Sequence, residues 1–189
     1  LAALKSNLKE QGWLDRDIFC LGIADEPNDE NSQSYRAIAS AIRKLFPEMK
    51  LYDATSGAPI YGSLDVWVPR TGEYEKTPHV FDHYKEKGDK VWHYVCLFPR
   101  EGGYINRFMD YPLLSTKYLH WGNYRHNLTG YLHWATNTYQ PGQDPFRQNC
   151  PSHTNADSTI FLPPGDTHLI YPGEHGPWLS ARGEAQRES

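Results

Sequence analysis

The stretch Asp17-Ile-Phe-Cys-Leu-Gly-Ile-Ala24, followed directly by Asp25-Glu26-Pro27, indicates the fold. Its apolar run is short and almost continuous, which is typical of a strand buried on both faces of a parallel sheet. The two acidic residues then stand at the carboxyl end of this strand, the edge at which α/β folds gather their active sites. We therefore predict an α/β fold with a functional site at Asp25 and Glu26.

Helical and strand patterns alternate along the rest of the chain. Helices are predicted for residues 1–11, 35–46, 79–87 and 113–127, and further strands for residues 50–54, 64–68, 90–98 and 131–135. This alternation implies a mostly parallel sheet with helical crossovers. Five strands suit either a small open sheet or a (β/α)8 barrel that lacks its first strands, and the abrupt start at Leu1 favours the barrel. We expect one partial domain, 1–189, whose tail, 139–189, forms long loops and the start of a last helix.

Composition limits the classes of partner. The net charge of the 189 residues is −4, and no basic run occurs, which argues against nucleic acid and anionic membranes. No apolar stretch approaches the roughly 20 residues of a membrane span. The 3 cysteines and 9 histidines show no metal-ligand spacing, so we predict neither a metal nor a cofactor.

The adjacent carboxylates suit the hydrolysis of glycosides. That reaction needs an acid to protonate the leaving oxygen and a second group to stabilise the oxocarbenium-like centre. We expect Pro27 to hold Glu26 in an extended backbone conformation and so to fix its direction. The competing interpretation is a solvated loop before a helix N-terminus, where acidic residues are favoured anyway.

Further motifs follow the carboxylate pair in a definite order. They are Gly22-Ile-Ala-Asp-Glu-Pro27, Tyr94-Val-Cys-Leu-Phe-Pro99, Tyr104-Ile-Asn106, Gly130-Tyr-Leu-His-Trp134 with Asn137, Asp144-Pro145, and Leu169-Ile-Tyr-Pro-Gly173 with Ser180 and Arg182. Together they resemble glycoside hydrolase family 123 and the related family numbered 4091 among domains of unknown function. The resemblance covers nearly the whole chain.

The resemblance implies a (β/α)8 TIM-barrel-like fold, of which this chain covers about the C-terminal five βα units. It also implies a retaining β-N-acetylgalactosaminidase-like hexosaminidase, in which the 2-acetamido group of the substrate attacks the anomeric carbon. Glu26 would then be the general acid/base, and Asp25 would orient the acetamido group. The segment Ser180-Ala-Arg-Gly-Glu184 departs from the family's usual Ser-Ile-Arg-Leu-Glu, which leaves the sugar open. Secretion or a periplasmic location is a further expectation from the resemblance.

Several aromatic and polar residues lie where predicted strands end, and the resemblance makes them candidates for binding the carbohydrate substrate. Aromatic rings can form a floor under the sugar, and amide, hydroxyl and guanidinium groups can bond its hydroxyls. These candidates are Trp134, Asn137, Tyr94, Tyr139, Trp67, Arg70 and Asn106.

Two alternatives stay open. In the first, Glu26 is the acid/base and Glu101 is a protein nucleophile, which requires carboxylates about 5–5.5 Å apart. In the second, the chain is a non-catalytic carbohydrate-binding or scaffold fragment. The exposed sheet edges of such a fragment would be covered by a second chain or by the missing barrel strands.

Overall fold

The computed structural model describes residues 1–16, 18–55, 57–100, 103, 105–154 and 159–189. They form two compact units, Leu1–Tyr94 and Val95–Ser189. Unit 1 contains α1 (Ala2–Glu10), a 3-10 turn (Leu14–Arg16), β1 (Cys20–Gly22), α2 (Ser32–Leu45), β2 (Lys50–Ala54), β3 (Val66–Val68), α3 (Thr71–Lys76), α4 (Pro78–Glu86) and β4 (Lys90–Tyr94). Unit 2 contains α5 (Leu113–His126), β5 (Gly130–Leu132), β6 (Pro151–Thr154), β7 (Thr159–Phe161), β8 (Ile170–Gly173), β9 (Gly176–Leu179) and α6 (Ala181–Arg187).

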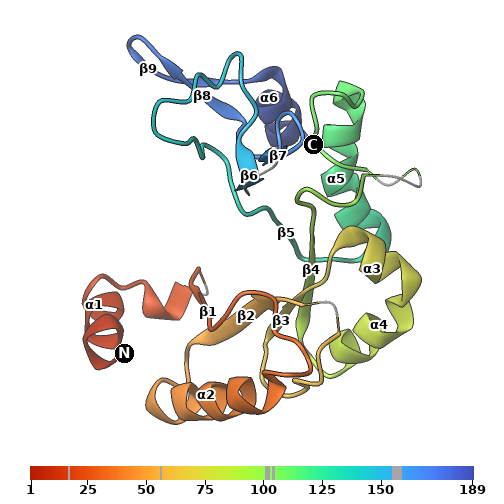
Figure 1. Cartoon of the computed structure of the whole chain (residues 1–189). Helices are drawn as coiled ribbons and strands as arrows, with labels where there is room; N and C mark the ends of the chain where they lie inside the picture. The colour runs from red at the N-terminus through yellow and green to blue at the C-terminus, as the bar shows by residue number, and fades with distance from the viewer. Residues whose placement is uncertain (17, 56, 101–102, 104, 155–158) are drawn as a thin grey trace. The chain divides into compact units, whose positions relative to one another are not determined.

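Unit 1 is built on a parallel sheet. Its strands lie in the order β1-β2-β3-β4, and each pairs in parallel with the next (Figure 1). Helix α2 connects β1 to β2, and helices α3 and α4 connect β3 to β4, as the alternating pattern predicts. The described residues of the connection from β2 to β3 contain no helix. The carboxyl ends of all four strands therefore lie at one edge of the sheet, and Asp25 and Glu26 follow β1 at that edge.

Helix α2 covers the sheet with one apolar face. Tyr35, Ala39 and Ile42 recur at helical spacing and are buried, and Phe46 just beyond the helix is fully buried. The Tyr35 hydroxyl bonds the Asp53 carboxylate of β2 at 3.0 Å, and Leu51 on the same strand is fully buried. Because α2, β2, β3 and β4 each contribute buried apolar residues, the first unit has its own core.

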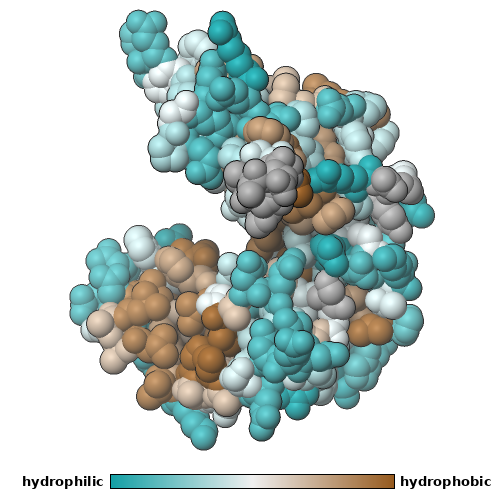
Figure 2. All heavy atoms as spheres, in the orientation of Figure 1, coloured by the Kyte–Doolittle hydropathy of each residue, from teal (hydrophilic) through white to brown (hydrophobic). Residues whose placement is uncertain are grey.

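The prediction that the first strand is buried on both faces is wrong. β1 covers only Cys20–Gly22, and Ile18 and Phe19 before it are 58% and 38% exposed. β1 is the edge strand of this sheet, so its apolar side chains lack the cover that an interior strand has. In Figure 2, brown apolar atoms gather over the N-terminal part of unit 1, where the exposed large apolar residues include Leu1, Leu4 and Trp13.

Other boundaries differ from the predicted ones in informative ways. β4 ends at Tyr94 rather than at residue 98, because the chain then turns and the Cys96 N–H bonds the Phe98 carbonyl at 2.9 Å. The six residues of α3 form a helix that the sequence patterns do not predict, and Pro78 at the start of α4 separates it from the next helix.

Unit 2 packs two helices together and adds two hairpins. α5 and α6 lie side by side in the described part of the chain (Figure 1). The expected start of a last helix is present as α6, whose N-cap Ser180 accepts a hydrogen bond from the Gly183 N–H at 3.1 Å. The tail holds more structure than long loops, because β6 pairs with β7 and β8 with β9, both antiparallel.

None of the helices within the described ranges is long and apolar enough to cross a membrane.

Candidate active site

A buried carboxylate holds the chain just before the acidic pair. Asp53, near the end of β2, is 3% exposed and accepts hydrogen bonds from the Ala24 N–H and the Tyr35 hydroxyl, both at 3.0 Å. Burial raises the pKa of Asp53, and hydrogen bonds from Ala24 and Tyr35 act in the opposite direction. The neighbouring strand therefore anchors the backbone that leads into Asp25.

Glu26 is held by a tyrosine from strand β4. The Tyr94 hydroxyl, at the end of β4, donates a hydrogen bond to Glu26 Oε1. Tyr94 is 4% exposed, whereas Asp25 and Glu26 are both exposed. A residue of β4 thus bonds a residue that follows β1, and one carboxylate oxygen of Glu26 is fixed while the residue stays open to solvent.

The expected extended conformation of Glu26 is wrong. Its φ is +48°, in the left-handed region that residues other than glycine seldom adopt. Pro27 favours an extended backbone for the residue before it, so the left-handed conformation of Glu26 departs from that preference. Strain of this kind at a non-glycine residue costs about 1–3 kcal/mol and gathers at functional sites.

Tyr52 is a neighbour of the acidic pair that sequence reasoning missed. Burial raises its pKa, and so do the nearby Cys20, Asp53 and Asp25. A Cβ added at Gly22 would lie 3.4 Å from the Tyr52 ring, so the ring covers the end of β1. The sequence signal that could have revealed it is the polar pair Tyr52-Asp53, which stands between Leu51 and Ala54 near the carboxyl end of β2.

The other two candidates in unit 1 differ in accessibility. Trp67 is fully buried, stacks on Tyr84 with ring centroids 4.1 Å apart, and donates from Nε1 to Asp89 Oδ2 at 2.9 Å. This placement makes Trp67 a core residue with no surface to offer a sugar. Arg70 is half-buried, forms a parallel bridge with Tyr94, and approaches Glu73 at 3.7 Å, so it lies beside the tyrosine that holds Glu26.

In unit 2, the candidates after β5 are open to solvent. Trp134 is 47% exposed, and its indole N–H bonds the fully buried Asp166 carboxylate at 3.1 Å. Asn137 is exposed, and Tyr139 is half-buried with a hydroxyl that has no hydrogen-bond partner among the described residues. Burial raises the pKa of Tyr139, with a smaller contribution from Tyr171. That Trp134, Asn137 and Tyr139 lie near Glu26 stays a prediction.

Trp134 rests on a buried charged network that the sequence patterns did not reveal. Arg107 is 1% exposed and donates to His133 Nδ1 at 2.8 Å, to the Asp166 carbonyl at 2.9 Å and to the Ala135 carbonyl. His133 Nε2 approaches Asp166 Oδ1 at 3.3 Å. Burial lowers the pKa of Arg107 to about 10 and that of His133 to about 4, although Asp166 acts to raise both. The Trp134 indole N–H is thus bonded to a carboxylate that belongs to a buried hydrogen-bonded network.

Asn106 has a structural position. It is fully buried, and its side-chain amide donates to the carbonyls of Cys96 at 3.0 Å and Pro99 at 3.1 Å. It therefore closes the loop after β4 rather than facing a substrate. Glu101, the alternative nucleophile, lies outside the described residues.

Across the described ranges, no group of three or more histidine, cysteine, aspartate or glutamate side chains is arranged to hold a metal ion.

Comparison with known proteins agrees with the site's chemistry. Residues 1–189 match the family described as "Glycoside hydrolase 123, catalytic domain". A search of curated proteins finds no match.

Proposed function

Because the chain belongs to the glycoside hydrolase 123 catalytic-domain family, we propose that it is a retaining β-N-acetylhexosaminidase, similar to a β-N-acetylgalactosaminidase. In this mechanism the 2-acetamido oxygen of the substrate attacks the anomeric carbon, and no protein nucleophile is needed. Asp25 and Glu26 supply the two groups that the reaction requires, a group that stabilises the acetamido nitrogen and an acid/base.

The hydrogen bond from Tyr94 to Glu26 carries this proposal. It occupies Oε1 of the carboxylate and leaves Oε2 to exchange a proton with the leaving oxygen. Glu26 then protonates that oxygen as the oxazoline forms, and later removes a proton from the water that opens the oxazoline. Asp25, exposed beside it, accepts a hydrogen bond from the acetamido N–H and stabilises the positive charge that develops there.

Two features of unit 1 support a partial (β/α)8 barrel as the scaffold. The strands are parallel, follow chain order and carry the acidic pair at their carboxyl edge, where such barrels place their sites. Exposed apolar side chains, Ile18 and Phe19 among them, lie next to the edge strand β1, where a preceding strand and helix would cover them.

Two chromogenic substrates test the mechanism. We expect the full chain to release nitrophenol from the 4-nitrophenyl N-acetyl-β-galactosaminide and not from the plain β-galactoside, which lacks the acetamido group. Glu26→Gln should reduce this turnover by roughly 10²–10⁴-fold, because it removes the transferable proton. Glu30→Gln, which changes an exposed carboxylate four residues away, is the matched control and should leave turnover unchanged. Equal turnover of both substrates would rule out substrate assistance and favour a protein nucleophile.

Tyr94→Phe tests the observation that carries the proposal. Loss of the hydroxyl frees Oε1 of Glu26, and the carboxylate then rotates among several orientations. We expect kcat to fall by about 10- to 100-fold with little change in KM, since the bond acts on the acid/base and not on sugar binding. An unchanged kcat would show that Tyr94 does not position Glu26.

A further inference from the structure

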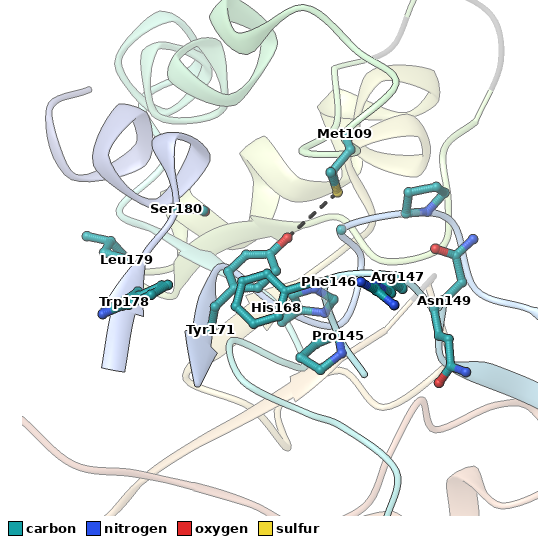
Figure 3. A pocket seen from close by; sticks show the side chains of 13 residues that line it. Met109, Pro145, Phe146, Arg147, Asn149, His168, Tyr171, Trp178, Leu179 and Ser180 are labelled. Atoms are coloured by element: carbon teal, nitrogen blue, oxygen red, sulfur yellow. Dashed lines mark hydrogen bonds between the residues drawn. The ribbon is translucent and has the colours of Figure 1, made fainter. Parts of the chain in front are cut away.

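An open cleft in unit 2 has a volume of about 500 Å³. Its walls come from the loop that holds Pro145–Asn149, from β8 and β9, and from Met109 and Pro164–Gly165. Figure 3 shows the side chains of Phe146, His168, Tyr171 and Trp178 around it. None of the residues of the proposed catalytic pair takes part, so the cleft needs its own explanation.

Trp178 forms one wall as a flat platform. Its indole lies over Gly173 on the paired strand of the β8–β9 hairpin, because a Cβ added at Gly173 would come within 2.3 Å of Trp178 Nε1. The glycine therefore lets the ring pack closely against the hairpin on one side. Trp178 is nevertheless 57% exposed, so much of its surface is presented to solvent.

Two more rings extend the aromatic wall. Phe146 lies 5.0 Å from Tyr171 and 6.3 Å from Trp178 between ring centroids, and it is 56% exposed. The Tyr171 hydroxyl donates to Met109 Sδ at 3.8 Å, which fixes the central ring, as Figure 3 shows. Large exposed rings that gather in one hollow mark a binding surface, because water solvates them poorly.

The polar lining selects an uncharged, hydroxyl-rich ligand. Gln148, Asn149 and Ser180 bring carboxamide and hydroxyl groups to the cleft. Among the described residues of the lining, Arg147 carries a permanent charge, and its Nε lies 3.7 Å from Asp144 Oδ2. Within the part of the lining that the structure describes, no carboxylate competes for hydroxyl groups as a strong acceptor. Aromatic faces beside neutral donors and acceptors match a pyranose ring, which has an apolar C–H face and a rim of hydroxyls.

One residue of the cleft lies beside a residue predicted to bind the substrate. His168 is a shared neighbour, with its ring 5.2 Å from Tyr139 and 4.7 Å from Tyr171 between centroids. We propose that the cleft lined by Phe146, Tyr171 and Trp178 is an additional sugar subsite that binds an uncharged pyranose residue of a glycan chain. The class of ligand rests on the proposed function, whereas the residues that line the cleft do not include Asp25 or Glu26.

Binding without turnover tests the subsite. The full chain carrying Glu26→Gln is titrated by calorimetry with β-1,4-galactohexaose and with chitohexaose, so that hydrolysis does not obscure binding. Trp178→Leu is compared with Trp121→Leu, which removes an indole of the same 57% exposure from α5, outside the cleft. We expect Trp178→Leu to weaken binding of at least one hexaose by roughly three- to tenfold, and Trp121→Leu to leave it unchanged.

Each outcome decides the proposal. The proposal would be overturned if both variants weakened binding equally or if Trp178→Leu did not weaken it. It would also be overturned if neither hexaose bound at millimolar concentration. If the wild-type chain hydrolyses neither chromogenic substrate but Trp178→Leu still weakens hexaose binding, the catalytic proposal fails and the subsite stands.

Discussion

Acidification is expected to destabilise unit 2 through His133. The His133 side chain is 2% exposed, and its Nδ1 accepts hydrogen bonds from the Arg107 guanidinium at 2.8 Å and from the Ala135 N–H at 3.2 Å. Because Nδ1 accepts, the neutral ring carries its proton on Nε2, which faces Asp166. A second proton on Nδ1 would point at two donors, one of them a cation, in a site that is almost fully buried.

The magnitude follows from the lowered pKa. Burial lowers the pKa of His133 from 6.5 to about 4. Since one pKa unit corresponds to about 1.4 kcal/mol, the neutral ring contributes about 3 kcal/mol to the free energy of unfolding. The unfolded chain binds the extra proton more readily than the folded chain, so this contribution is fully present above pH 6.5. It is lost as the pH falls from 6.5 towards 4.

Urea unfolding at pH 7, 5.5 and 4 measures this loss. His133→Asn keeps an acceptor oxygen near the position of Nδ1 but cannot titrate, so its free energy of unfolding should fall less than that of wild type. We expect the difference between the two proteins to change by about 3 kcal/mol across the window. His175→Asn, at an exposed position in the β8–β9 turn, is the control and should follow wild type. A difference between wild type and His133→Asn that is constant with pH would refute the reasoning.

Two further substitutions test a close contact at Gly165 and the hydrogen bonds of Asp53. Gly165→Ala would place a Cβ 2.3 Å from the Arg182 guanidinium, which three carbonyl acceptors hold in place. We expect it to lose about 1–3 kcal/mol more than Gly142→Ala, whose φ of +78° is similarly positive but which has open space around it; equal losses in urea unfolding would contradict this. Asp53→Ala leaves the Ala24 N–H without its acceptor, so we expect a loss of about 2–4 kcal/mol together with loss of chromogenic turnover. Retained turnover would show that Asp53 does not position the acidic pair.

Local patterns predicted most of the regular structure of unit 1. The apolar stripe of α2 and the strand β2 are encoded by neighbouring residues, and each lies within a few residues of its predicted bounds. The acidic pair also follows from local order, since Asp25 and Glu26 are adjacent and follow a strand. Short elements such as α3 escaped prediction because six residues carry too little periodicity to outweigh their polar composition.

The partners of the candidate site were decided by the tertiary structure. Glu26 and Tyr94 are 68 residues apart, and Ala24 and Asp53 are 29 apart, so the strand order and register determine whether they meet. The same holds in unit 2 for Arg107 and Asp166, which are 59 residues apart. By itself, the sequence determined the longer helices, the main parallel strands and the acidic pair, because these depend on short-range patterns. Only the folded chain decided that Trp67 and Asn106 are buried and that Glu26 is left-handed, because burial and backbone strain depend on contacts between distant segments.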